Sequence, residues 1–153
     1  MQTAVVASAD TPAFSEVIEH RRALIQEISG VDWDLRLPGW RERYSAYYAA
    51  AFASGAAILV ASRHGSEYGG SCIASIQDEF RRTVCGRGLG YINGLYVAPS
   101  VRKRHAGTEL VRTAMAWLRD RGCLVIRLHP SSRSGEFYRR LGFTPIRELE
   151  YRG

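Results

Sequence analysis

Residues 91–110 constrain the fold and the function of this chain more than any other stretch. They begin with apolar and aromatic residues typical of a β-strand, which must end at Pro99 because proline cannot donate to a strand ladder. A basic turn follows, and an amphipathic helix begins near Gly107. A strand–basic loop–helix unit gathers unpaired helix N–H groups and basic side chains at one point. Such a unit favours the binding of a phosphate group.

The rest of the sequence predicts strands and helices arranged around this unit. Apolar runs predict further strands over 3–8, 56–62, 67–77, 123–129 and 143–151. Helical spacing and capping residues predict helices over 11–29, 40–54, 107–121 and 134–141. A strand–helix–strand crossover requires a parallel pair, and a hairpin over 56–77 requires an antiparallel one. The order predicts an α/β fold (α+β by some schemes), with a mixed, mostly antiparallel twisted sheet of about six strands flanked by four helices.

The predicted helices carry their apolar residues on one face each. The first has a face that includes one arginine: Phe14, Val17, Ile18, Arg21, Leu24, Ile25 and Ile28. The second carries an aromatic stripe: Trp40, Tyr44, Tyr47, Tyr48 and Phe52. Such a stripe belongs either to the core or to an interface, which leaves a homodimer open as a possible assembly.

Length and composition bound the class of protein. The 153 residues predict a single domain over 1–153, and a hydrophobic fraction of 46% fits a globular chain. No apolar run is long enough to span a membrane, and no secretory signal is recognisable, so we expect a cytoplasmic protein without membrane contact. The polar segment over 78–90 is expected to be a mobile connection.

Net charge indicates the kind of partner, and the cysteine and histidine positions bear on metal binding. The net charge of +6 favours an anionic partner, a phosphorylated cofactor ahead of a nucleic acid. Cys72, Cys85 and Cys123 lack metal-ligand spacing and are expected to be free buried thiols. The scattered histidines form no metal-binding motif, so no metal site is predicted.

The loop over 30–39 places two carboxylates around an aromatic residue. In one interpretation Asp32 and Asp34 cap a turn or face solvent while Trp33 packs on the core. In the other, the three residues form a wall that receives a cationic or amine substrate. The sequence leaves both interpretations open.

Two motifs resemble the GNAT N-acetyltransferase superfamily. Residues 97–108 resemble its acyl-coenzyme A pyrophosphate loop, usually V-x-P-x-x-R/Q-x-x-G-x-G/A, with Arg102 at the Arg/Gln position and Gly107 at the final glycine. His105 stands where the family prefers glycine. Residues 136–143 are similar to the family's FY..LGF signature. The element order agrees along the whole chain, although the specific motifs lie only from residue 91 onward.

The resemblance implies acetyl-coenzyme A as co-substrate and a set of contacts for it. Backbone N–H groups and basic side chains of the loop would bind the pyrophosphate: Arg102, Lys103, Arg104, His105, Ala106, Gly107 and Thr108. The pantetheine arm would pair with the backbone of Leu95, Tyr96 and Val97, which requires the 91–97 strand to splay from the 123–129 strand. Ser131 replaces a family asparagine that contacts the cofactor. His105 could adopt helical torsions, stack near the adenine or weaken binding.

The resemblance also implies catalytic roles. Tyr138 would donate a proton to the leaving sulfur. Many members carry a carboxylate on the strand that contains Asn93, and an asparagine cannot accept a proton but could hold a water or the amine. Deprotonation would then go through water to a distant group such as His129, Glu148 or Glu150, or a substrate amine of low pKa would need no base.

The function implied is an N-acetyltransferase. It would move an acetyl or other small acyl group from acyl-coenzyme A to a primary amine of a small molecule, by direct attack in a ternary complex. One alternative is a transferase with another donor, such as aminoacyl-tRNA or acyl carrier protein, which is the one way a nucleic acid would enter. The other alternative is a non-catalytic acyl-coenzyme A-binding module.

Overall fold

The computed structural model describes residues 2–77 and 88–153, so most of the predicted connection over 78–90 lies outside the described residues. The described chain contains β1 (Gln2–Val6), α1 (Pro12–Ser29), α2 (Trp33–Arg36), α3 (Trp40–Ala53), β2 (Ala57–His64), β3 (Glu67–Gln77), β4 (Leu89–Val97), a 3₁₀ turn (Pro99–Val101), α4 (Ala106–Asp120), β5 (Ile126–Leu128) and α5 (Gly135–Arg140).

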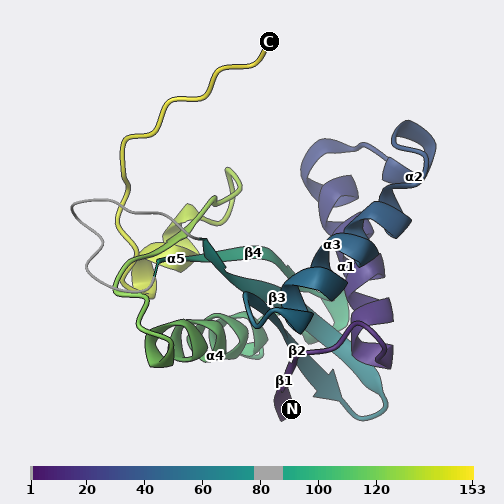
Figure 1. Cartoon of the computed structure of the whole chain (residues 1–153), viewed down its shortest axis with the longest axis horizontal. Coiled ribbons are helices and arrows are strands. Elements are labelled where there is room, and N and C mark those ends of the chain that lie inside the picture. The colour runs from purple at the N-terminus through teal and green to yellow at the C-terminus, as the bar shows by residue number, and fades with distance from the viewer. Residues whose placement is uncertain (1, 78–87) are drawn as a thin grey trace.

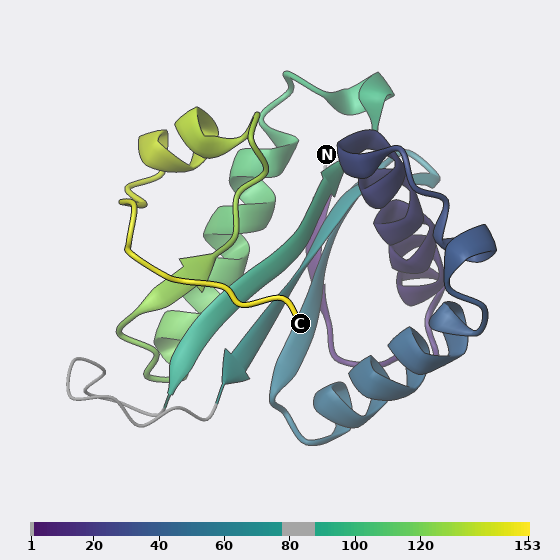
Figure 2. The ribbon, with the colours of Figure 1, turned by 90° about the horizontal axis from the view of Figure 1, so that it is seen from above.

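The strands form one sheet in the order β1-β2-β3-β4-β5. The first three neighbouring pairs are antiparallel, and β4 pairs with β5 in parallel. Helices α1 to α3 cover one face of the sheet, and α4 and α5 cover the other (Figures 1 and 2). The predicted mixed and mostly antiparallel sheet is confirmed, with five strands among the described residues instead of about six.

Each face of the sheet carries its own hydrophobic cluster. On the α4 side, Leu110, Val111 and Leu118 are fully buried against Val60 and Ile92. On the other side, α1 and α3 pack on β2 and β3. Tyr48 and Phe52 of the aromatic stripe belong to this second cluster, whereas Tyr47 is exposed. The stripe therefore serves mainly the core.

Local signals placed the helix ends correctly. The Thr11 hydroxyl accepts a hydrogen bond from the N–H of Phe14, and Pro12 occupies the first turn of α1. Gly30 ends this helix in a left-handed conformation. The predicted loop over 30–39 contains one helical turn, α2, because the Asp32 side chain accepts from the N–H of Asp34 and caps it.

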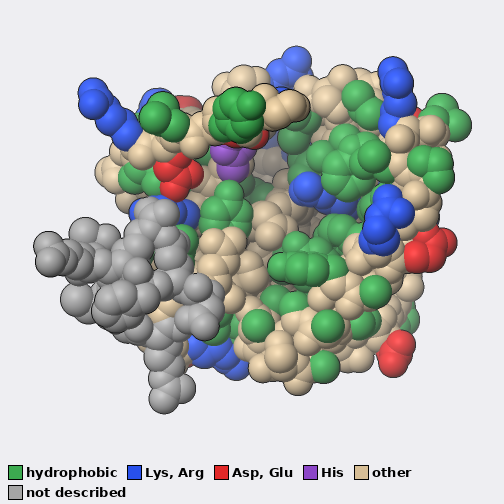
Figure 3. Space-filling model, turned by 45° about the horizontal axis from the view of Figure 1, so that its top comes forward, with side chains coloured by type: hydrophobic (Ala, Val, Ile, Leu, Met, Phe, Trp, Pro, Cys, Tyr) green, Lys and Arg blue, Asp and Glu red, His purple; other side chains and the backbone are tan. Residues whose placement is uncertain are grey.

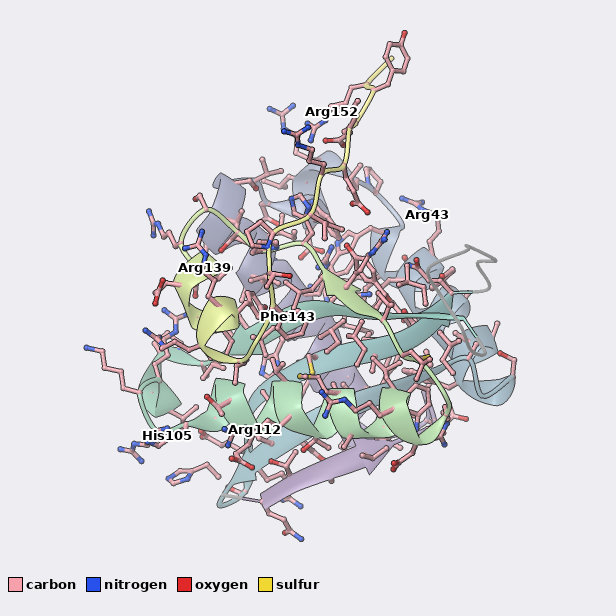
Figure 4. The ribbon with its side chains drawn as sticks, turned by 90° about the vertical axis from the view of Figure 1, so that its left-hand side faces the viewer. Arg43, His105, Arg112, Arg139, Phe143 and Arg152 are labelled. Carbon is pink, nitrogen blue, oxygen red and sulfur yellow. The ribbon has the colours of Figure 1, made fainter. Side chains whose placement is uncertain are left out.

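The prediction of a last strand over 143–151 is wrong. These residues form no strand, and Ile146, Leu149 and Tyr151 are exposed. The segment leaves the body of the molecule, with Arg152 far from the sheet (Figures 1 and 4). The strand predicted over 123–129 is also shorter, because only Ile126–Leu128 pairs with β4. Apolar residues give the segment over 143–151 strand propensity, but a strand forms only where it pairs along an edge, and within the described chain this segment leaves the outer edge of β5 unpaired.

Within the described residues, no helix is both long enough and apolar enough to cross a membrane. Cys72 and Cys123 are free and buried, as predicted, and Cys85 lies outside the described residues.

Two leucine substitutions test this division between core and C-terminal segment. Leu118 is fully buried and Leu149 fully exposed. Leu118→Ala should lower the free energy of unfolding by roughly 2–5 kcal/mol, because it leaves a cavity in the core. Leu149→Ala should change it by less than about 0.5 kcal/mol. Chemical denaturation measures both, and a large loss for Leu149→Ala would show that the C-terminal segment is packed in solution.

Candidate functional site

The first component of the site is an open edge of β4. Pairing between β4 and β5 runs from Gly90 to Ile92 and then ends. The register between β3 and β4 shifts just beyond, so that two β4 residues, Gly94 and Leu95, stand opposite a single β3 residue. Gly94 has a positive φ of 64°, as such a bulge favours. The bulge bends β4, and its residues 93–97 have no strand neighbour on the β5 side within the described chain. The predicted splay is present.

The second component is the basic loop that follows β4. Lys103 and His105 are left-handed, and α4 begins directly after them. Among the described residues, the backbone N–H groups of 103–108 donate to no acceptor. Successive free N–H groups in such a turn form a concavity that binds anions, and the dipole of α4 adds to its positive potential. The loop is therefore suited to a phosphate or pyrophosphate group.

His105 is the irregular member of this loop. It precedes α4 with φ 62° and ψ 4°, so the helical torsions considered from the sequence are not those observed. Figure 4 shows it at the start of the helix, with Arg112 further along. A left-handed conformation costs a residue other than glycine roughly 1–2 kcal/mol. His105 thus adopts the left-handed backbone conformation that is typical of glycine, although it carries a side chain.

The basic side chains of the loop differ in their surroundings. Arg102 donates from Nε to the carbonyl oxygen of Val97 at 2.9 Å and from Nη2 to the Glu27 carboxylate at 2.7 Å. It therefore ties the end of β4 to α1. Arg104 approaches His64 at 3.5 Å between Nη1 and Nε2. Their contacts with a phosphate, like that of Lys103, stay predictions.

The second motif packs directly against the first. A Cβ atom placed on Gly107 would lie 3.4 Å from Cζ of Phe137 and 3.5 Å from Cγ2 of Val97. These are ordinary contact distances, and they show that α5, the start of α4 and the end of β4 meet at Gly107. Two sequence blocks predicted to act together meet in space.

Tyr138 follows Phe137 and is buried in the cluster on the α4 side. Burial raises the pKa of its hydroxyl well above the usual range, and the nearby thiol of Cys72 acts in the same direction. The hydroxyl keeps its proton at neutral pH and makes no hydrogen bond with any described residue. It has the properties of an available proton donor.

Asn93 lies immediately before the bulge. Its Oδ1 accepts a hydrogen bond from the Tyr48 hydroxyl at 3.3 Å, and burial raises the pKa of Tyr48. This contact fixes the amide so that its NH₂ group can donate. The prediction that Asn93 holds a water or an amine stays a prediction.

Ser131 lies in the turn before α5. Its hydroxyl donates to the Ser134 hydroxyl at 2.9 Å, and that hydroxyl donates to the Ser131 carbonyl at 3.2 Å. Both hydroxyls therefore shape the turn, and a contact of Ser131 with a cofactor stays a prediction.

The two carboxylates of the α2 region are neutralised. Arg22 pairs with Asp32 at 2.8 Å and with Asp34 at 2.9 Å, and Arg41 pairs with Asp34 at 2.8 Å. Hydrogen bonds from Arg41 and Trp40 lower the pKa of Asp34 to about 2. These pairs fasten α2 to α1 and α3. A role of Asp32, Trp33 and Asp34 in substrate binding stays a prediction, and the ion pairs weaken the attraction of this wall for a cation.

Two residues of α1 border the site without having been predicted. His20 approaches the Ser71 hydroxyl through Nδ1 at 2.9 Å, and its ring centroid lies 4.9 Å from that of Tyr96. Burial lowers its pKa, so it is neutral at pH 7. Arg21 reaches the bulge at Gly94. The signal for Arg21 was its place on the apolar face of the predicted helix.

The distant groups considered as bases lie near the C-terminal segment. Glu148 pairs with Arg127 at 2.9 Å, and Glu150 pairs with Arg152 at 3.1 Å. Both carboxylates are exposed. Their role as proton acceptors, like that of His129, stays a prediction.

A pocket of about 680 Å³ lies between β5, α5 and the C-terminal segment. Leu128, Tyr138, Phe143 and Ile146 contribute to its lining, whereas the basic loop and residues 93–97 do not. It is therefore separate from the phosphate-binding loop. No cluster of metal-ligating side chains occurs in the described ranges 2–77 and 88–153.

Comparison with known proteins agrees with this geometry. The sequence model of the acetyltransferase (GNAT) family matches residues 25–143. A glucosamine 6-phosphate N-acetyltransferase of Trypanosoma brucei brucei is 36% identical over 74 residues, which cover 48% of this chain and 49% of that protein. An aminoglycoside N(6')-acetyltransferase type 1 of Klebsiella aerogenes is 35% identical over 68 residues, 44% of each. The match thus spans about half the length of these curated relatives.

The fold has solved counterparts. A predicted acetyltransferase of Clostridium acetobutylicum, whose crystal structure contains acetyl-coenzyme A, superposes with a TM-score of 0.82 at 15% identity. The alignment covers 99% of this chain and 95% of that one. At this identity the likeness concerns the fold.

The left-handed His105 generates a test that needs no ligand. His105→Gly should raise the free energy of unfolding by about 1 kcal/mol, because glycine adopts this conformation without steric cost. Arg112→Gly, at an exposed position inside the same helix, should lower it by about 1 kcal/mol. Equal losses for both variants in thermal or chemical denaturation would contradict the left-handed assignment.

Proposed function

Because the chain belongs to the acetyltransferase (GNAT) family, we propose that it transfers an acetyl or other small acyl group from acyl-coenzyme A to the primary amine of a small molecule, by direct attack in a ternary complex. The names of both curated relatives specify transfer to nitrogen, which supports an amine as the acceptor. The crystal structure with acetyl-coenzyme A supports this donor.

One observation carries the proposal: unsatisfied backbone groups occur at two consecutive places along the chain. The β4 backbone over 93–97 is open on the β5 side, and the N–H groups of 103–108 lack acceptors among the described residues. An extended, amide-bearing arm can add to an open strand edge, and a pyrophosphate can accept from a run of N–H groups at a helix start. The residues present therefore fit coenzyme A.

The residues that would hold the donor follow from this arrangement. Leu95, Tyr96 and Val97 offer backbone groups to the pantetheine arm. The N–H groups of 103–108 would donate to the pyrophosphate oxygens, with Lys103 and Arg104 adding positive charge. When bound, acyl-coenzyme A supplies a thioester that an amine can attack and a thiolate that can leave.

We assign the remaining chemistry to the β4 backbone, Tyr138 and Asn93. A β4 N–H group at the bulge would stabilise the negative charge that develops on the carbonyl oxygen. Tyr138 would give its hydroxyl proton to the departing sulfur, since this hydroxyl is protonated at neutral pH and makes no hydrogen bond with a described residue. Asn93 would hold the amine, or a water that takes up its proton, through the amide that Tyr48 orients.

Acetyl-coenzyme A binding tests the proposal directly. At a concentration one hundred times its Kd, a ligand that binds only the folded state stabilises it by about 2.7 kcal/mol. Acetyl-coenzyme A should therefore raise the melting temperature in a concentration-dependent way, and an amine panel should then reveal thiol release. No stabilisation at millimolar concentration would refute the proposal.

Replacing Tyr138 tests the proton donor. Tyr138→Phe should lower kcat by at least about tenfold, because general acid catalysis is lost, while acetyl-coenzyme A affinity stays within about twofold. Tyr47→Phe is the control, since Tyr47 is exposed on α3. Unchanged kcat in Tyr138→Phe would remove this tyrosine from the mechanism.

A further inference from the structure

Arg21 is a basic side chain of α1 that points at the bulge of β4. A Cβ atom placed on Gly94 would lie 3.8 Å from its Nη1, and its guanidinium carbon lies 5.2 Å from the ring centroid of Trp33. Burial raises the pKa of Tyr44 and Tyr48, and the positive charge of Arg21 acts against this rise in both. The guanidinium therefore lies among aromatic side chains of α2 and α3, beside the proposed reaction centre.

No group among the described residues accepts a hydrogen bond from this guanidinium. Its Nε is buried and has no hydrogen-bond partner, and Arg21 forms no ion pair there. Arg127 also has a buried Nε without a partner, but its Nη1 pairs with Glu148. A buried donor left unsatisfied is costly, and more so when it carries a charge. The unsatisfied Nε of Arg21 thus lowers the stability of the folded protein, and Arg21 lies beside the proposed reaction centre.

The other arginines of this region are compensated. Arg22, the next residue on α1, pairs with Asp32, and Arg41 pairs with Asp34 and with Glu19. Arg102 pairs with Glu27. The carboxylates of Asp32, Asp34, Glu19 and Glu27 are thus paired with other arginines, and among the described residues Arg21 has no carboxylate partner. An anion is the chemical group that would balance its charge.

We propose that the guanidinium of Arg21 binds an anionic group of the acceptor, a carboxylate or a phosphate, so that the substrates of this enzyme are amines that also carry a negative charge. This inference rests on the proposed function. Arginine is suited to the role because its planar donors match both anions. An anion held beside Gly94 would lie next to Asn93 along the strand, which leaves the amine of the same molecule close to the open edge.

The surroundings also select against other amines. A polycationic amine would meet the positive charge of Arg21, while Asp32 and Asp34 are already neutralised. The aromatic walls from Trp33, Tyr44 and Tyr48 suit a small organic body between amine and anion. Figure 3 shows one face of the molecule hollowed near its centre, where hydrophobic and basic side chains meet.

The test uses matched amines that differ in one anionic group. Glucosamine 6-phosphate is compared with glucosamine, and phenylalanine with phenethylamine. The Nε–H resonance of Arg21, identified by its loss in Arg21→Lys, is followed by NMR during each titration, with and without acetyl-coenzyme A. We expect it to shift with the probe that carries the phosphate or carboxylate and not with the matched amine that lacks this group. A shift in the glucosamine pair would indicate that Arg21 binds a phosphate, and a shift in the phenylalanine pair would indicate that it binds a carboxylate.

Turnover and stability supply independent readouts. With the anionic probe that binds, Arg21→Gln should lower kcat/KM by at least about tenfold. Arg112→Gln, which removes the same charge from an exposed site on α4, should leave kcat/KM unchanged. Arg21→Gln should not lower the melting temperature by much, since the guanidinium has no hydrogen-bond or ion-pair partner among the described residues and only its contact with the Trp33 ring is lost; a large loss would make Arg21 a structural residue.

Two outcomes would overturn the inference. The Arg21 resonance could fail to respond to both anionic probes at millimolar concentration, or it could respond equally to the matched amines that lack the anionic group. If acetyl-coenzyme A still stabilises the protein in either case, the proposed function stands and only the substrate class is wrong. If acetyl-coenzyme A itself does not bind, the proposed function fails whatever Arg21 does.

Discussion

The candidate site depends on the point along β4 at which its parallel pairing with β5 ends. Pairing with β5 ends at Ile92, and the bulge at Gly94 turns the following residues away. Buried backbone groups must find partners, so a strand edge left open inside a domain is costly unless a ligand completes it. The same strand delivers the chain to the loop before α4, where a further run of N–H groups lacks acceptors. Both features therefore suit one long ligand with amide and phosphate groups.

Two residues around the open edge of β4 lower the stability of the folded protein. His105 adopts a left-handed conformation without being glycine, and Arg21 is half-buried without a counterion among the described residues. Elsewhere the chain satisfies its groups in ordinary ways, as in the ion pairs of Arg22 and Arg41. Unsatisfied groups that gather at one place are typical of functional sites, where a ligand supplies the missing partner.

The sequence predicted the features that depend on neighbouring residues. Thr11 and Pro12 begin α1 where expected, and the basic loop precedes α4 as its motif required. Features that depend on distant partners were missed. The segment over 143–151 has apolar residues suited to a strand but does not pair with the outer edge of β5. The ion pairs of Asp32 and Asp34 required knowing that α1 lies beside α2. Arg21 was visible as a charge on an apolar face, but its position at the bulge came only from the fold.

Amide hydrogen exchange with and without acetyl-coenzyme A tests the central claim most directly, because it reports each backbone N–H separately. Our account predicts that the ligand slows exchange at residues 93–97 and 103–108 and leaves β1 and β2 nearly unchanged. Protection confined to other parts of the chain, or none at saturating ligand, would contradict the view that these open backbone groups form the donor site.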